Sequence, residues 1–199
     1  NKHPLLMIRG VPGTHDYKII YEFFKKVKNK KFSKLRLPKF DKSKDDRCNK
    51  KLWYKINSRP DVIILEGWCV GAKAQKNSQL SKPINNLEKI KDPYLVWRNY
   101  VNIQLKMHYK NLFKHLNEII YLKANNFRVL QKWRIKQEKT LWLKSKNKKN
   151  LKIMNRDDII KFMQTYQRIT QNMFKDAPKY ASIVMELNSS HQINSIKFK

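Results

Sequence analysis

The sequence predicts an α/β fold in which a mainly parallel sheet is flanked by helices. Short, uninterrupted apolar runs occur at 62–65 and 119–122, and such runs are typical of buried parallel strands. Longer stretches with apolar residues three and four positions apart lie between and after these runs, as in amphipathic helices. This alternation favours a parallel sheet. Since 41% of the 199 residues are hydrophobic and 12% are aromatic, we expect a single folded domain over 1–199.

The first 60 residues are expected to form one helix with short extended segments around it. The helix has apolar residues at helical spacing with lysines between them, and Thr14 is its predicted cap. In chain order the predictions are an extended segment at 4–9, a turn at 10–14, a helix at 15–28, a strand at 35–40 and a polar loop at 41–51, anchored by the apolar residues 52–54.

The run from Asp61 to Trp68, with the sequence DVIILEGW, is predicted to hold a buried central strand. It is aliphatic and β-branched, and it is too short for a helix. Glu66 then stands at the carboxyl end of the strand, which is where open α/β sheets bind their ligands.

The second half of the chain is predicted to contain three long helices and three strands. Asn155 is the expected cap of the last helix. The predicted helices cover 93–115, 126–145 and 156–175, one strand covers 119–122, and the segments SIVMEL and INSIKF form two strands joined by the turn NSSHQ.

The formal net charge of +30 invites a nucleic-acid interpretation, because basic surfaces bind phosphate backbones. However, only nine of the 45 basic residues are arginines, the residue best suited to phosphate and base recognition. The lysines are spread along the chain among many asparagines and isoleucines, as an AT-rich genome would impose. We therefore expect no specific nucleic-acid partner. A basic nucleic-acid-binding module is the alternative from a different functional class.

The cysteines and the apolar runs indicate the setting in which the chain works. Cys48 and Cys69 have no partner at CxxC spacing, so the sequence encodes neither a disulfide framework nor a zinc site, and we expect a reducing cytoplasm. No apolar run approaches the roughly 20 residues that span a bilayer, so we expect no membrane partner. The chain begins with Asn1, and we expect it to be a fragment that lacks its amino-terminal elements.

Two segments contain the strongest candidates for chemistry. Glu66, at a strand end, could bring a carboxylate near magnesium and a transferred phosphate, although such an acid could equally solvate the edge of the sheet. The segment RGVPGTHD, from Arg9 to Asp16, precedes a helix whose amino-terminal N–H groups and dipole favour anions. Helix capping would explain Thr14 in that segment, but it gives no reason for Arg9 or His15.

Two further segments have a functional and a purely structural interpretation. The loop DKSKDDR at 41–47 could reach the same crevice, and it could also be a solvated loop. Arg134 lies on a predicted helix from which it could close onto ATP phosphates as a lid. Glu138 is four residues later, so a surface ion pair explains Arg134 as well.

Taken in order, these segments resemble the bacterial branch of the D-glycerate 3-kinase-like P-loop kinases. The resemblance runs through nearly all of the chain. It is carried by RGVPGTHD, LPKFDKSKDDR, DVIILEGWCVGA, PINNLEKIKDPYLVWRNYVN and WRIKQE, and then by MNRDDIIKFMQTYQRIT and IVMELNSSHQI.

The resemblance implies a P-loop NTPase-like fold and an ATP- and Mg²⁺-dependent kinase that phosphorylates a hydroxyl of a small-molecule acceptor, most simply D-glycerate. It also implies a role for each matching residue. Catalysis would involve Asp16 and Glu66, with Glu66 near magnesium; substrate binding would involve Arg9, His15, Lys42 and Arg47; and cofactor binding would involve Arg134.

The sequence also departs from this family. The glycine-rich loop GxxxxGK[ST], which cradles the ATP phosphates, does not occur among the 199 residues. The acidic strand-end motif that normally follows it is missing as well. We therefore expect the chain by itself to be inactive or nearly so. The family's plant members also carry glycines around the Asp46-Arg47 pair that are missing here, so a kinase of the same fold with another alcohol acceptor is a further alternative.

Overall fold

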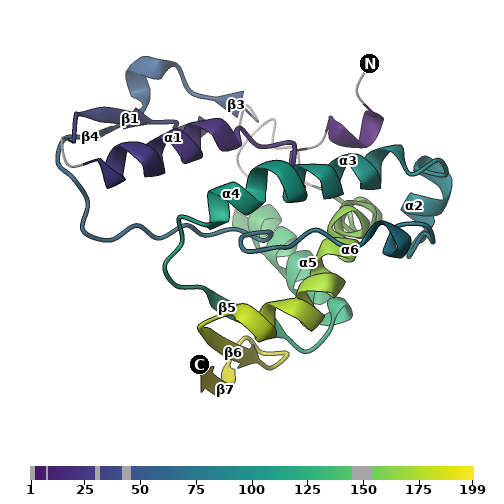
Figure 1. Ribbon diagram of the computed structural model, residues 1–199. Coiled ribbons are helices and arrows are strands. Elements are labelled where there is room, and N and C mark those ends of the chain that lie inside the picture. Colours follow the sequence, from purple (N-terminus) through teal and green to yellow (C-terminus); the bar gives the residue numbers. More distant parts are fainter. Residues whose placement is uncertain (1–2, 8, 30–31, 42–45, 145–153) are drawn as a thin grey trace.

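The computed structural model describes residues 3–7, 9–29, 32–41, 46–144 and 154–199, and it has a mixed α/β fold (Figure 1). Long helices occupy the middle, and a three-stranded sheet lies beside them near the C-terminus. The helices are α1 (Tyr17–Lys28), α2 (Asn86–Lys91), α3 (Val96–Gln104), α4 (Lys110–Phe113), α5 (Phe127–Lys144) and α6 (Arg156–Tyr180). The strands are β1 (Leu35–Leu37), β2 (Phe40–Asp41), β3 (Asp46–Arg47), β4 (Tyr54–Ile56), β5 (Ile120–Ala124), β6 (Ile183–Leu187) and β7 (Ile193–Phe198).

A π-helical turn at Leu105–Tyr109 joins α3 to α4, so that 96–113 forms one continuous helical rod. The prediction of one long helix over 93–115 is therefore confirmed, with a local change of hydrogen bonding in its middle. The shorter α2 before it was not predicted. Its cap is Asn85, whose side chain accepts a hydrogen bond from the backbone N–H of Glu88.

The main hydrophobic core lies where α3, the π turn and α4 pack with α1 and α6. Its buried members come from elements far apart in the sequence, so burying them holds the N-terminal segment, α1, α3, α4 and α6 together. They include Val11, Phe24, Cys69, Trp97, Val101, Leu105, Tyr109, Leu112, Tyr166, Ile169 and Met173.

Parallel pairing is confined to one pair of strands among the described residues. Strand β5 pairs with β6 in parallel, from Ile120 opposite Ile183 to Ala124 opposite Leu187, and β6 pairs with β7 antiparallel. The other two pairs, β1–β4 and β2–β3, are also antiparallel. The predicted mainly parallel sheet is therefore not what these residues form. The predicted C-terminal pair of strands is confirmed.

The prediction of a buried strand in the run Asp61–Trp68 is wrong. Residues 62–67 form no regular element, and Val62 and Ile64 are 76% and 88% exposed. Ile63 and Leu65 instead pack against the core, so the side chains alternate between core and solvent. The physical reason is that a strand exists through hydrogen bonds to a neighbour, and no described strand lies alongside this segment.

Three smaller predictions near the N-terminus also need correction. Pro4–Leu6 is a 3₁₀ turn and not an extended segment, because the side chain of His3 accepts a hydrogen bond from the N–H of Leu5. Helix α1 begins after Asp16, so Thr14 is not its cap. The apolar anchor at 52–54 is largely exposed, with Leu52 at 63% and Tyr54 at 57%.

The long C-terminal helices were predicted well. Helix α6 begins after Asn155, whose side chain accepts a hydrogen bond from the N–H of Asp158 at 2.9 Å, as the predicted cap requires. Met163 on this helix is fully buried against α5. None of the described helices is long and apolar enough to cross a membrane.

A network of buried charges ties α2 to α6. Glu88 has no exposed surface, and its carboxylate accepts hydrogen bonds from Arg168 Nε at 2.7 Å and Nη2 at 2.6 Å. Arg98 lies beside it, 3.5 Å from the Asp92 carboxylate, and donates to the carbonyl of Leu80. All four charged side chains are buried, so each depends on the others for its partners.

Candidate functional site

The segment Gly10–Asp16 forms a tight loop that the side chain of Thr14 closes. The Thr14 hydroxyl accepts a hydrogen bond from the N–H of Gly10 at 2.7 Å and donates one to the carbonyl of Val11 at 2.7 Å. Gly13 has φ of 97°, in the left-handed region that favours glycine. Thr14 therefore shapes this loop, which explains why it is not available to cap α1.

The π turn holds the middle of this loop. The Tyr109 hydroxyl lies 3.0 Å from Nδ1 of His15 and also accepts a hydrogen bond from the N–H of Gly13 at 3.3 Å. Next to it, the Tyr17 hydroxyl lies 2.9 Å from Nδ1 of His108, and the two rings are stacked. Two residues from one helical rod thus fix the positions of His15 and of the start of α1.

Two arginines border the loop on the side of the β2–β3 pair. Arg47 donates to the carboxylate of Asp16 at 3.0 Å, and both side chains are about half exposed. The guanidinium of Arg9 lies 3.6 Å from the centre of the Phe40 ring. Because Phe40 is paired with Arg47 in the β2–β3 register, both arginines stand beside the same short ribbon.

Tyr166 of α6 contacts both the Gly10–Asp16 loop and the segment that follows Glu66. A side chain at Gly10 would collide with its hydroxyl, and the Trp68 ring lies 5.3 Å from its ring. Burial raises the pKa of Tyr166 to about 12, and the positive charges of Arg9 and Arg134 act in the opposite direction. Arg134 lies 5.9 Å from the centre of the Phe162 ring, which packs against the ring of Tyr166.

Glu66 is exposed and lies two residues before Trp68. The indole N–H of Trp68 donates to the hydroxyl of Thr170 at 2.8 Å, which fixes this segment against α6 one turn beyond Tyr166. Since Tyr166 also contacts Gly10, Glu66 lies in the same region of the molecule as the Gly10–Asp16 loop. A shared site of Glu66 with Arg9 and His15 stays a prediction.

Arg134 has a structural partner. It donates a hydrogen bond to Glu138, which is buried and also accepts from the backbone N–H of Met154. The ion pair four residues apart, which was the structural interpretation of Arg134, is thus present. A role for Arg134 in binding a cofactor stays a prediction, as do the roles of the other site residues.

Lys42 lies outside the described residues. The structure brings Arg9, His15, Asp16 and Arg47 together, and it places Arg134 beside Phe162, whose ring packs against that of Tyr166. Sequence reasoning missed two residues here, Tyr109 and Tyr166, because at helical spacing they fit an apolar face. The polar function of each hydroxyl depends on loop contacts that periodicity does not report.

Burial and the positive charge of Arg9 lower the pKa of His15 below its ordinary value of 6.5. The folded state therefore binds this proton less readily than the unfolded state, so the stabilisation is present above about pH 6.5 and is lost as the pH falls. We expect the wild-type chain to lose more unfolding free energy than His15→Gln between about pH 7 and pH 5. Urea unfolding at both pH values measures this, and equal losses would contradict it.

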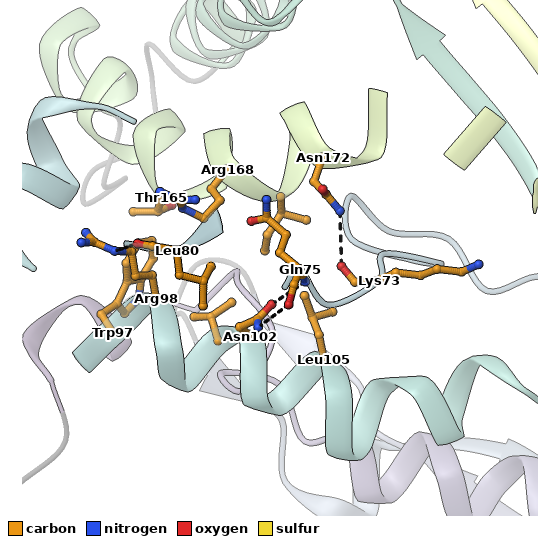
Figure 2. Close-up of a pocket in the computed structure, with 12 residues that line it drawn as sticks. Lys73, Gln75, Leu80, Trp97, Arg98, Asn102, Leu105, Thr165, Arg168 and Asn172 are labelled. Atoms are coloured by element: carbon orange, nitrogen blue, oxygen red, sulfur yellow. Dashed lines mark hydrogen bonds between the residues drawn. The ribbon is translucent and has the colours of Figure 1, made fainter. Parts of the chain in front are cut away.

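Two hollows lie outside this cluster. A cavity of about 20 Å³ between α3 and α6 is bridged by paired hydrogen bonds between Gln75 and Asn102 and by one from Asn172 to the carbonyl of Lys73 (Figure 2). It has room for about one water molecule, so it is a packing gap and not a substrate pocket. An open groove of about 1000 Å³ between residues 71–77, the π turn with α4, and Tyr180 is lined by five lysines and by no carboxylate.

The described residues contain no group of three or more histidine, cysteine, aspartate or glutamate side chains that could hold a metal ion. A Mg²⁺ ion that is held mainly by nucleotide phosphates needs only one or two protein carboxylates, and the exposed Glu66 is of this type. The residues present thus fit a phosphate-bound ion and do not fit a metal centre built from protein ligands alone.

The chain is similar in sequence to three kinases from yeasts and a plant, while no family model matches it. The uncharacterized kinase mug58 of Schizosaccharomyces pombe is 26% identical over 82% of the chain. The probable ATP-dependent kinase TDA10 of Saccharomyces cerevisiae is 32% identical over 69%, and the chloroplastic D-glycerate 3-kinase of Arabidopsis thaliana is 26% identical over 67%. The chain spans 58%, 47% and 28% of these proteins, respectively.

Two solved structures share the fold. The D-glycerate 3-kinase from Cryptococcus neoformans var. grubii superposes with a TM-score of 0.76 at 20% identity, covering 100% of this chain and 72% of that one. The YGR205w protein superposes with a TM-score of 0.69 at 27% identity, covering 99% of this chain and 69% of that one. The chain thus has the mixed α/β fold of these proteins, and it matches only a part of each relative.

Proposed function

We propose that the chain is the acceptor-binding part of an ATP-dependent kinase that transfers the γ-phosphoryl group to a hydroxyl of a small acid, most simply D-glycerate. The observation that carries this proposal is the cluster of Arg9, His15, Asp16 and Arg47 around one closed loop. Similarity to kinases with the same fold, one of them named a D-glycerate 3-kinase, supports it. The two guanidinium groups and the one carboxylate beside the Gly10–Asp16 loop suit a substrate that has both a carboxylate and a hydroxyl.

Each residue of the cluster has a proposed role. Arg9 and Arg47 neutralise the acceptor's carboxylate, and His15 donates a hydrogen bond to it. Asp16 accepts the proton of the attacking hydroxyl, and Arg47 holds the Asp16 carboxylate in place. With these roles, the hydrogen bonds that hold the Gly10–Asp16 loop against the helical rod 96–113 keep the reacting groups in fixed positions.

MgATP would supply the phosphoryl group, and Glu66 is the carboxylate placed to help orient the metal ion or its waters. The fit to the nucleotide is partial, because the sequence has no GxxxxGK[ST] loop whose N–H groups hold the phosphates. We propose that this loop is supplied by a segment outside the 199 residues and that the chain alone has little or no activity. A P-loop-type fold for the whole protein, membership of the bacterial branch and a reducing cytoplasmic location, which would suit the unpaired thiols Cys48 and Cys69, belong to the same proposal.

The test compares the 199-residue chain with a longer protein in which a GxxxxGK[ST]-bearing segment precedes it. That segment is taken from the gene's own upstream reading frame or, failing that, from TDA10. ATP consumption is measured with D-glycerate, L-glycerate, other hydroxy acids, pantothenate and a nucleoside. We expect turnover with a hydroxy acid in the longer protein and little or none in the chain alone.

Three other outcomes separate the alternatives. No turnover with any acceptor would count against the kinase proposal, and turnover with only the nucleoside or pantothenate would change the acceptor. Binding to DNA that persists at about 150 mM salt would favour a nucleic-acid-binding module, because purely electrostatic binding weakens steeply there.

A further inference from the structure

The π turn at Leu105–Tyr109 does more than pack in the core, because it also makes hydrogen bonds to the Gly10–Asp16 loop and to Tyr17. Such turns are rare, and they shift the side chains that follow by adding a residue to one helical turn. Here the turn ends on Tyr109 and includes His108, and these adjacent residues both hydrogen-bond to the segment 13–17. The ring of Tyr109 is in the core, so only its hydroxyl reaches the loop.

The Tyr109 hydroxyl has two hydrogen-bond neighbours, the N–H of Gly13 and the Nδ1 of His15. The hydroxyl has one proton, and it accepts from the N–H of Gly13. Its own proton is available for donation to His15 Nδ1, 3.0 Å away, in the tautomer in which this nitrogen accepts. A histidine that accepts at Nδ1 is neutral and has its proton on Nε2. The lowered pKa of His15, caused by burial and by Arg9, agrees with a neutral ring.

We propose that Tyr109 is a positioning residue that fixes His15 as its neutral Nε2–H tautomer and thereby sets it as a hydrogen-bond donor to the acceptor. This deepens the proposed function and rests on it for the identity of the ligand. The tautomer itself does not depend on the ligand. The groups that face His15 are the Tyr109 hydroxyl from the π turn and the Arg9 guanidinium from the loop, while the adjacent Asp16 is paired with Arg47.

The same turn provides a matched control. Tyr17 and His108 form a tyrosine–histidine pair of the same kind, with the hydroxyl 2.9 Å from Nδ1, but its histidine is on the rod and not in the loop. Tyr17→Phe removes a hydroxyl of the same type from the same region. It should alter the signals of His108 and leave the tautomer of His15 unchanged.

The experiment is a long-range ¹H–¹⁵N correlation spectrum of the imidazoles in the 199-residue chain, recorded as a function of pH. His15 is assigned with His15→Gln. In the wild-type chain we expect the neutral His15 to be protonated at Nε2. In Tyr109→Phe we expect a mixture of tautomers and a higher His15 pKa, because the lost hydrogen bond had favoured the neutral form. An unchanged tautomer in Tyr109→Phe overturns the proposal. A wild-type His15 protonated at Nδ1 overturns it as well, and this measurement needs only the wild-type chain, so it tests the proposal even if the variant does not fold.

The kinetic arm uses the longer, active protein. Tyr109→Phe should raise KM for the acceptor about 3- to 10-fold, as expected for one neutral hydrogen bond, and leave KM for ATP unchanged. Tyr17→Phe should change neither value. An equal rise in both KM values would indicate general damage and overturn the positioning role. If no acceptor is turned over, the proposed function fails, while the spectra still decide the role of Tyr109.

Discussion

Replacing Glu88 with alanine is expected to lower the free energy of unfolding by about 3–5 kcal/mol. The carboxylate is fully buried and accepts two hydrogen bonds from Arg168 and one from the N–H of Ile84. Removing it leaves the Arg168 guanidinium, only 8% exposed, without its carboxylate partner, while the neighbouring Arg98 keeps the Asp92 carboxylate at 3.5 Å. An uncompensated buried charge is among the most costly defects that a single substitution produces.

The measurement is urea unfolding followed by circular dichroism. Glu22→Ala is the matched control, because Glu22 pairs with Lys25 on α1 with both side chains about half exposed. It should change stability by no more than about 0.5 kcal/mol. A loss below about 1 kcal/mol for Glu88→Ala would mean that water reaches the network and replaces the missing partner.

In the longer protein with an ATP-binding segment, Asp16→Asn is expected to lower kcat about 10²- to 10⁴-fold, with little change in stability. The reason follows from the proposed function: the amide keeps the shape of the carboxylate and can still meet Arg47, but it cannot take the proton from the acceptor hydroxyl. The half-exposed position of Asp16 means that its substitution leaves the core intact.

Steady-state kinetics with the preferred hydroxy acid checks this expectation, and Asp157→Asn in the exposed first turn of α6 is the control. A fall in kcat of less than about 10-fold would remove Asp16 from proton transfer, because general-base catalysis contributes at least about 100-fold. A large rise in KM for the acceptor with kcat unchanged would instead make Asp16 a binding residue.

The helices were predictable from the sequence, but the sheet was less so. A helix fulfils its own backbone hydrogen bonds, so the spacing of apolar residues and a cap such as Asn155 are sufficient to locate it. A strand depends on a neighbour that the local sequence does not name. The run at 62–65 has the composition of a buried strand and is not one here. The run at 119–122 does form a strand, β5, because β6 lies beside it, but Ile120 and Leu122 are exposed and not buried as predicted.

The candidate site was predictable where charges are close in sequence, and not where a core residue turns a polar atom toward a loop. Arg9, His15 and Asp16 stand out in RGVPGTHD, and the structure brings Arg47, which the sequence also suggested, to Asp16 across 31 residues. Tyr109 and Tyr166 were found only in three dimensions, because each has a ring in the core and a hydroxyl beside the loop.

The alternation of exposed and core-facing side chains at 62–65 also affects how copies of the chain associate in solution. Val62 and Ile64 face the solvent, as do Ile120 and Leu122 on β5, whose described partner occupies only one edge. An uncovered strand edge with apolar side chains is a template for adding a strand from another molecule. The charge of +30 keeps copies apart while the ionic strength is low. Added salt shortens the range of that repulsion to about 10 Å at 0.1 M, so salt should drive the chains into β-rich aggregates.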